Sequence, residues 1–212
     1  MTRAGLVLLT LTLLGAGVAG ADDWPGPRVF TVFSESGRYF VRFLPGESVG
    51  DTVGFTGAPK GRYATALLYA LQPDRAYRLQ HEITLTNPVL PLGALVADDG
   101  AFITFDNWHN VGFGKVVAIY APTGRLIRSW ELTDLYPKDR IETIPRSVSS
   151  RYWRCAPTHF VEPKDGKSVY VPEALGGYFV FTLATGSVAH TAGTRKECKP
   201  PELPLSRSTL GR

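Results

Sequence analysis

The amino-acid sequence of 212 residues predicts an all-β fold of about three four-stranded antiparallel units with one short helical insertion. Three observations lead to this prediction. A hairpin with a turn glycine recurs three times, each copy is followed by a second hairpin, and the segments between the turns are rich in valine, isoleucine, tyrosine and phenylalanine. Such residues fit a pleated, half-buried surface, so these segments are expected to be strands.

The first hairpin of each unit carries its glycine in the turn. The three hairpins span residues 32–43, 96–106 and 161–171. Their turn glycines, Gly37, Gly100 and Gly166, recur at nearly equal intervals. Glycine suits a tight reversal because it adopts a positive φ without the steric cost of a Cβ atom. The regular spacing predicts a repeated structural unit.

The second hairpin of each unit completes four strands. These hairpins span residues 66–79, 116–130 and 178–190. Pro73-Asp74, Thr123-Gly124 and Thr185-Gly186 supply their turns. Two hairpins per unit therefore predict a four-stranded antiparallel sheet in each repeat.

A short turn before an apolar strand, followed by a second hairpin, resembles the blades of secreted β-propellers of the TolB or WD40-like type. The matching segments are Phe33–Gly37, Ala97–Gly100 and Glu162–Gly166. This resemblance implies a propeller-like protein. Closed propellers typically have four to eight blades, so three units imply either an open arc with covered edges or a dimer that closes a six-bladed ring. Residues 144–154 are also similar to a stretch of uncharacterised exported bacterial proteins.

The N-terminus predicts a cleavable signal peptide over residues 1–21. Arg3 provides a positive charge, Leu6–Leu14 form an apolar stretch, and Ala19-Gly20-Ala21 provide the small residues of a cleavage site. A membrane anchor is the alternative, but a span needs roughly 20 apolar residues. We therefore expect a secreted or periplasmic protein without a membrane span after cleavage.

The remaining chain divides into one domain and a tail. We expect a propeller-like domain at 22–192, with units at about 29–85, 92–132 and 158–192, an insertion at 133–157, and a proline-rich tail at 193–212. Within the insertion, Pro145 is expected to start a short helix with Thr143 as its cap, since proline is tolerated in the first helical turn.

Two cysteines, Cys155 and Cys198, are expected to form a disulfide in an oxidising compartment. The four histidines stand far apart and Asp98-Asp99 fit an ordinary hairpin turn, so neither a metal nor a cofactor is predicted. The net charge is +4, and the basic residues are scattered through loops, which disfavours a nucleic-acid partner.

One segment imitates a catalytic motif. Gly46-Glu-Ser-Val-Gly50 matches the Gly-x-Ser-x-Gly pattern of serine hydrolases. That chemistry needs a strand before the serine and a helix after it, whereas Pro45 and the glycine-rich residues 51–57 predict a loop on both sides. Ser48 is therefore expected to be a loop serine between two hairpins, and no catalytic residue is predicted.

The candidate ligand-binding residues follow a predicted strand, where binding residues on β scaffolds tend to collect. They are Asp106, Asn107, Trp108, His109, Arg151 and Trp153. Asp106 and His109 suit acid–base chemistry, and an indole offers a face for a sugar ring or a peptide. A structural role is the favoured interpretation, in which the polar groups satisfy the turn and Trp108 packs on the core.

The sequence thus favours a non-enzymatic binding protein whose partner is another protein or a component of the cell envelope. A homodimer is a further alternative. A small extracytoplasmic hydrolase or carbohydrate-binding protein that uses the loop from Asp106 to His109 is the competing prediction. The hydrolase requires Asp106, His109 and Arg151 to converge in one pocket.

Overall fold

The computed structural model describes residues 25–155, 158–160 and 167–193. The signal-peptide prediction, Cys198 and all but the first residue of the predicted tail lie outside these residues. No helix in the described part of the chain is long and apolar enough to cross a membrane.

The described residues form three four-stranded antiparallel sheets, which confirms the predicted fold class. Each sheet pairs its strands in chain order, because each consists of two consecutive hairpins. The first sheet contains β1 (Phe30–Phe33), β2 (Tyr39–Leu44), β3 (Thr65–Leu71) and β4 (Tyr77–Thr84). The second contains β5 (Gly93–Val96), β6 (Phe102–Phe105), β7 (Val117–Tyr120) and β8 (Leu126–Trp130). The third contains β9 (His159–Phe160), β10 (Ser168–Pro172), β11 (Tyr178–Thr182) and β12 (Ser187–Thr191).

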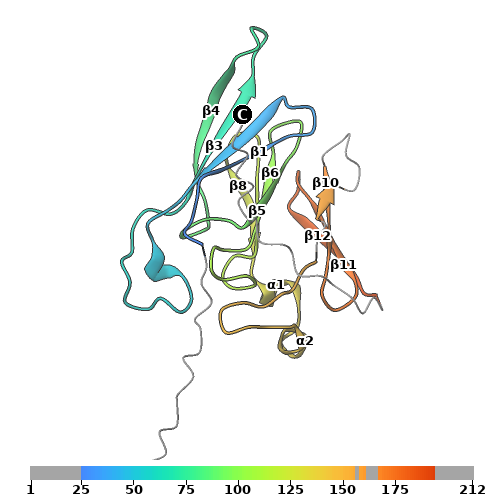
Figure 1. Cartoon of the computed structure of the whole chain (residues 1–212). Helices are drawn as coiled ribbons and strands as arrows, with labels where there is room; N and C mark the ends of the chain where they lie inside the picture. Colours follow the sequence, from blue (N-terminus) through green and yellow to red (C-terminus); the bar gives the residue numbers. More distant parts are fainter. Residues whose placement is uncertain (1–24, 156–157, 161–166, 194–212) are drawn as a thin grey trace, which may run out of the picture.

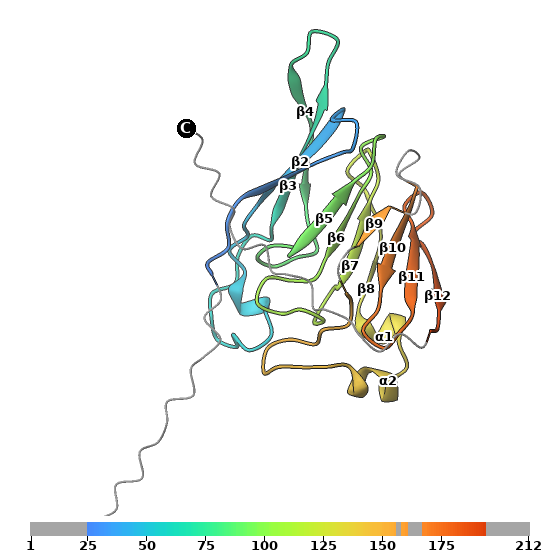
Figure 2. The ribbon, with the colours of Figure 1, turned by 45° about the vertical axis from the view of Figure 1, so that its right-hand side comes forward.

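The three sheets lie beside one another in an open arrangement, with the second in the middle (Figures 1 and 2). All residues of its central strands β6 and β7 are buried. Successive residues of a strand point to opposite faces, and here both faces meet a hydrophobic core. Phe102 joins the core shared with the first sheet, whereas Ile103 joins the core shared with the third. The middle sheet is therefore covered on both sides.

The outer sheets bury one face each. In β2, the buried residues Val41 and Phe43 alternate with the exposed Arg42. In β11, Phe179 and Phe181 are buried in the core shared with the second sheet. This alternation is the pattern of a sheet that packs on one side only.

The glycine turns of the first two units contact one another. Gly100 has a φ of +92°, and a Cβ atom there would lie 3.0 Å from the Tyr39 ring. In the same turn, the Asp98 carboxylate accepts hydrogen bonds from the backbone N–H of Ser36 at 3.0 Å and from its hydroxyl. The repeated turn thus joins neighbouring sheets as well as neighbouring strands.

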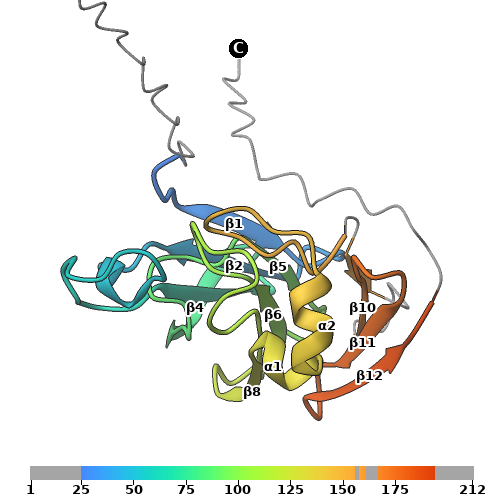
Figure 3. The same cartoon turned by 90° about the horizontal axis from the view of Figure 1, so that it is seen from below.

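The insertion contains two short helices, α1 (Leu132–Leu135) and α2 (Lys138–Thr143), at one end of the molecule (Figure 3). The predicted helix start at Pro145 is wrong, and Thr143 ends a helix instead of capping one. Residues after Pro145 find backbone partners in other segments. Arg151 N–H donates to the Val111 carbonyl at 2.8 Å. These tertiary hydrogen bonds replace those that a helix would provide.

Candidate functional site

Asp106, the first predicted site residue, lies in the interior. It is 0% exposed and has a φ of +57°. Its carboxylate accepts hydrogen bonds from Arg154 Nε at 2.7 Å, from Trp153 Nε1 at 2.8 Å and from the Gly112 N–H at 3.0 Å. Trp153 and Arg154 belong to the insertion, so this cluster fastens the insertion to the loop that follows β6.

Trp108 and His109 lie in a different environment. The Trp108 indole N–H donates to the Pro25 carbonyl at 3.0 Å, and the ring is partly packed against the core shared by the first two sheets. The His109 ring packs edge-on against Phe55, with 4.7 Å between ring centroids. Both side chains therefore pack near the first sheet and its loops.

The Arg151 side chain has contacts with other residues of the insertion and of loop 106–116. Its guanidinium donates to the Ile141 carbonyl at 3.0 Å and lies over the Phe113 ring at 5.7 Å from its centroid. None of Asp106, His109 and Arg151 lines the pocket between the first two sheets. The hydrolase alternative stays a prediction.

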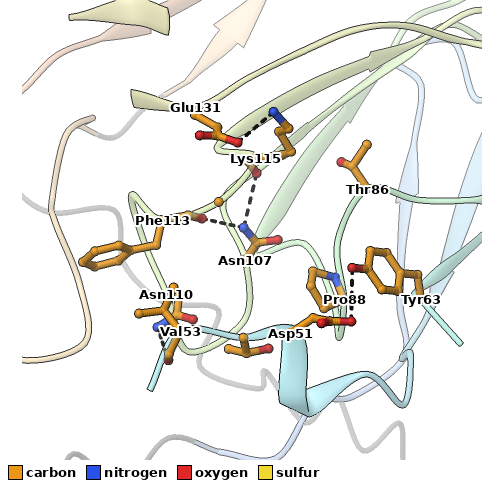
Figure 4. A pocket seen from close by; sticks show the side chains of 12 residues that line it. Asp51, Val53, Tyr63, Thr86, Pro88, Asn107, Asn110, Phe113, Lys115 and Glu131 are labelled. Carbon is orange, nitrogen blue, oxygen red and sulfur yellow. Dashed lines mark hydrogen bonds and ion pairs between the residues drawn. The ribbon is translucent and has the colours of Figure 1, made fainter. Parts of the chain in front are cut away.

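Asn107 is the predicted site residue that does line a pocket. The pocket has a volume of about 180 Å³ and lies between loops of the first two sheets (Figure 4). Loop 45–64 contributes Asp51 and Tyr63, and loop 106–116 contributes Asn107, Asn110 and Lys115. Loop 85–92 and the residue after β8 complete the wall with Thr86, Pro88 and Glu131.

The Asn107 side chain is held in one orientation by three hydrogen bonds. Its amide nitrogen donates to the carbonyl of Phe113 at 2.6 Å and to that of Lys115 at 3.3 Å. Its amide oxygen accepts from the Asn87 amide at 2.7 Å. Because two loop carbonyls hold its nitrogen and the Asn87 amide holds its oxygen, Asn107 shapes the pocket wall.

Asn110 lines the pocket and carries a buried acceptor without a hydrogen-bond partner among the described residues. The side chain is buried, with 1% of the residue exposed. Its amide nitrogen donates to the carbonyls of Val53 at 3.1 Å and Ser149 at 3.2 Å. Its amide oxygen, by contrast, has no hydrogen-bond partner among the described residues. A buried acceptor without a partner costs about 1–3 kcal/mol, so a donor group that reached this oxygen would recover that cost.

The charged groups of the pocket are paired. Asp51 forms an ion pair with Lys60 at 2.5 Å and accepts hydrogen bonds from Ser48 Oγ at 2.6 Å and Tyr63 OH at 3.3 Å. The hydrogen bond from Lys60, followed by that from Ser48, lowers the pKa of the Asp51 carboxyl below 3.8. Lys115 and Glu131 pair at 2.8 Å on the opposite wall.

Ser48 lies in the loop between β2 and β3, as the sequence predicts. It is buried and precedes a short 3₁₀ helix at Val49–Asp51. Its hydroxyl donates to Asp51 and accepts from the Gly61 N–H at 3.1 Å. The serine therefore supports the loop that carries Asp51.

Of the residues that line the pocket, only Asn107 was predicted from the sequence as a site residue. Asp51 and Tyr63 belong to the first unit, whereas Asn110 and Lys115 belong to the second, and nothing in the sequence states that these loops meet. The available signal was the concentration of polar residues in loops at the same ends of repeated strands. That signal identified the loop with Asn107 but not its partner loop.

Cys155 is buried, and its N–H donates to the Pro172 carbonyl at 2.7 Å. Its predicted disulfide partner, Cys198, lies outside the described residues, so this disulfide stays a prediction. No cluster of three histidine, cysteine, aspartate or glutamate side chains suited to a metal occurs within the described ranges.

Comparison with known proteins assigns no family. No family model matches the chain, and no curated protein matches it. Among solved structures, the chain is similar to the crystal structure of HIRA(644-1017), with 8% sequence identity and a TM-score of 0.37. The similarity covers 79% of this chain but only 56% of the HIRA chain. The three antiparallel sheets are therefore known from the structure of this chain and not from similarity to another protein.

Proposed function

We propose that this protein is a non-enzymatic binding protein that holds a neutral sugar ring of a cell-envelope component in the pocket between the first two sheets. The observation that carries this proposal is the buried Asn110 amide. Both N–H groups of its nitrogen are used by backbone carbonyls, while its buried oxygen has no hydrogen-bond partner among the described residues. A sugar hydroxyl or acetamido N–H is a donor of the required kind.

The size of the pocket supports a single ring. A cavity of about 150 Å³ holds one benzene molecule, so a volume of about 180 Å³ suits one six-membered ring with small substituents. The wall combines hydroxyl and amide groups with the rings of Tyr63 and Phe113. A sugar presents both polar edges and apolar C–H faces, which matches this mixture.

The charges of the pocket support a neutral ligand. Asp51 is neutralised by Lys60, and Glu131 by Lys115. A charged ligand would therefore lose its hydration without gaining an ion pair in the pocket. Predicted export and the propeller-like repeat are consistent with an envelope ligand, and both remain part of the proposal.

The test is a titration of the isotopically labelled protein with neutral and charged monosaccharides and short oligosaccharides, followed by amide NMR. We expect neutral sugars to shift the resonances of Asn107, Asn110 and Tyr63. The exposed Val53 lies at the pocket, so Val53→Trp is expected to block binding. Val148→Trp, at a more exposed valine that does not line the pocket, should bind like the parent.

Two results would contradict the proposed site. One is the absence of shifts at these residues with every neutral sugar at millimolar concentration. The other is binding that survives Val53→Trp, which would place the ligand elsewhere on the protein.

The affinity is expected to be constant between about pH 8 and pH 5. The lowered pKa of Asp51 keeps its carboxylate ionised throughout this range, so its bonds with Lys60 and Ser48 persist. Protonation below pH 3.8 removes the ion pair that shapes loop 45–64 and should weaken binding. Calorimetry across this range, with the Asp51 carboxyl carbon shift as a monitor, checks the prediction. A loss of affinity centred above pH 5 would contradict it.

A further inference from the structure

The outer face of the first sheet carries an apolar row that crosses all four strands. Strand register places Phe33 opposite Phe40, Phe40 opposite Tyr69, and Tyr69 opposite Leu79. The ring centroids of Phe33 and Phe40 lie 5.0 Å apart, and those of Phe40 and Tyr69 lie 4.6 Å apart. Phe33 is nevertheless 55% exposed and Leu79 is 49% exposed. The Tyr77 ring packs edge-on against Phe40 and Phe33, at 4.8 and 6.2 Å between ring centroids, and leaves Phe33 and Leu79 as the exposed parts of the row.

The neighbouring row on the same face carries opposite charges. Arg42 and Glu82 flank Leu67, with Arg42 on β2 and Glu82 on β4. Both charged residues are exposed, and neither takes part in an ion pair within the described part of the chain. The row therefore presents one positive and one negative charge at equal distances on either side of β3.

The position of this face in the fold explains why it is uncovered. The second sheet is packed between two others, but the first sheet is packed on one side only. The β3–β4 hairpin also extends beyond the rest of the sheets, with Leu71 and Tyr77 exposed near its tip (Figures 1 and 2). A second layer on this face would bury these exposed apolar side chains and so stabilise the sheet.

We propose that a second copy of this chain covers this face and forms a twofold dimer whose axis runs parallel to β3. This rotation places the outer faces of the two first sheets against each other. Each row then faces the same row of the partner, and β2 of one copy lies opposite β4 of the other. Tyr69 then faces the partner's Tyr69, and Phe40 faces the partner's Leu79. Face-to-face sheets pack about 10 Å apart, which side chains of this size can fill.

Charge complementarity selects a second copy as the occupant. In the same rotation, Arg42 faces the partner's Glu82, and symmetry produces this pair twice. A face with only one sign of charge would repel its own copy, whereas this row is complementary to itself. The arrangement differs from the six-bladed ring considered from the sequence, in which the first sheet would face the third sheet of the other copy.

The experiment is sedimentation velocity on the purified protein from micromolar to millimolar concentration. We expect a monomer–dimer equilibrium. Arg42→Glu and Glu82→Arg should each weaken dimerisation by about tenfold or more, because each places two pairs of like charges in contact. The double variant should restore the affinity to within about threefold of the parent, because it re-forms both pairs in reverse.

Arg62→Glu provides the matched control. Arg62 is an exposed arginine paired with Glu47 in loop 45–64, away from this face, so its reversal should leave dimerisation unchanged. Circular dichroism confirms that each variant is folded. A protein that stays monomeric at millimolar concentration overturns the proposal and leaves the face to a partner of another sequence. A double variant as weak as the single ones also overturns it.

Discussion

Replacement of Asp106 by alanine is expected to lower the free energy of unfolding by about 3–5 kcal/mol. The change leaves the Arg154 guanidinium buried without its carboxylate, since the Arg154 side chain is only 8% exposed. It also removes the acceptor for Trp153 Nε1 and the Gly112 N–H. A buried charge that loses its partner is costly because no water replaces the lost interaction. Equilibrium unfolding in urea measures the change.

Two further variants separate the causes. Asp106→Asn keeps one side-chain acceptor oxygen and tolerates the positive φ of +57°, so it should cost less than alanine. Asp74→Asn removes a carboxylate that is exposed and paired with the exposed Arg78, and it should cost less than about 1 kcal/mol. If Asp106→Ala were no more destabilising than Asp74→Asn, the buried pair would not hold the insertion in place.

Replacement of Gly112 by alanine is expected to lower the free energy of unfolding by about 2–5 kcal/mol. Gly112 has a φ of +75°, which L-residues rarely adopt. A Cβ atom there would also collide with the backbone carbonyl of Arg151 and lie 2.8 Å from its Cβ atom. The substitution therefore pushes the insertion away from the loop after β6, where the Asp106 cluster is formed.

Gly54→Ala is the control for the backbone conformation. Gly54 has a φ of +90°, but a Cβ atom there would meet nothing within 4 Å. This variant should cost only the conformational strain of about 1–2 kcal/mol. The difference between the two variants in urea unfolding then measures the collision with Arg151. Equal losses would show that the insertion moves aside without cost.

The strands were predictable because their information is local. Alternation in segments such as Tyr39–Leu44 and the glycine turns between them set strand positions without reference to distant residues. The helices of the insertion were harder to place. Pro145 satisfies the local rule for a helix start, yet the segment after it is stabilised by hydrogen bonds to residues far along the chain, such as that from Arg151 to Val111.

The candidate site shows the same division. The sequence identified the polar loop after β6, but it grouped six residues that the fold separates. Asp106 and Trp153 bind one another in the interior, whereas Asn107 lines the pocket. A loop reverses direction within a few residues, so neighbouring side chains point to different environments that only the surrounding segments define.

The sequence by itself therefore determined the three-unit all-β architecture, since alternation and turn chemistry act over a few residues and repeat along the chain. Only the tertiary structure decided which side chains meet. The pocket joins Asp51 with Asn110, and the outer face of the first sheet places Arg42 and Glu82 on either side of β3. Both depend on how sheets and loops pack, and packing is decided by contacts between residues far apart in the chain.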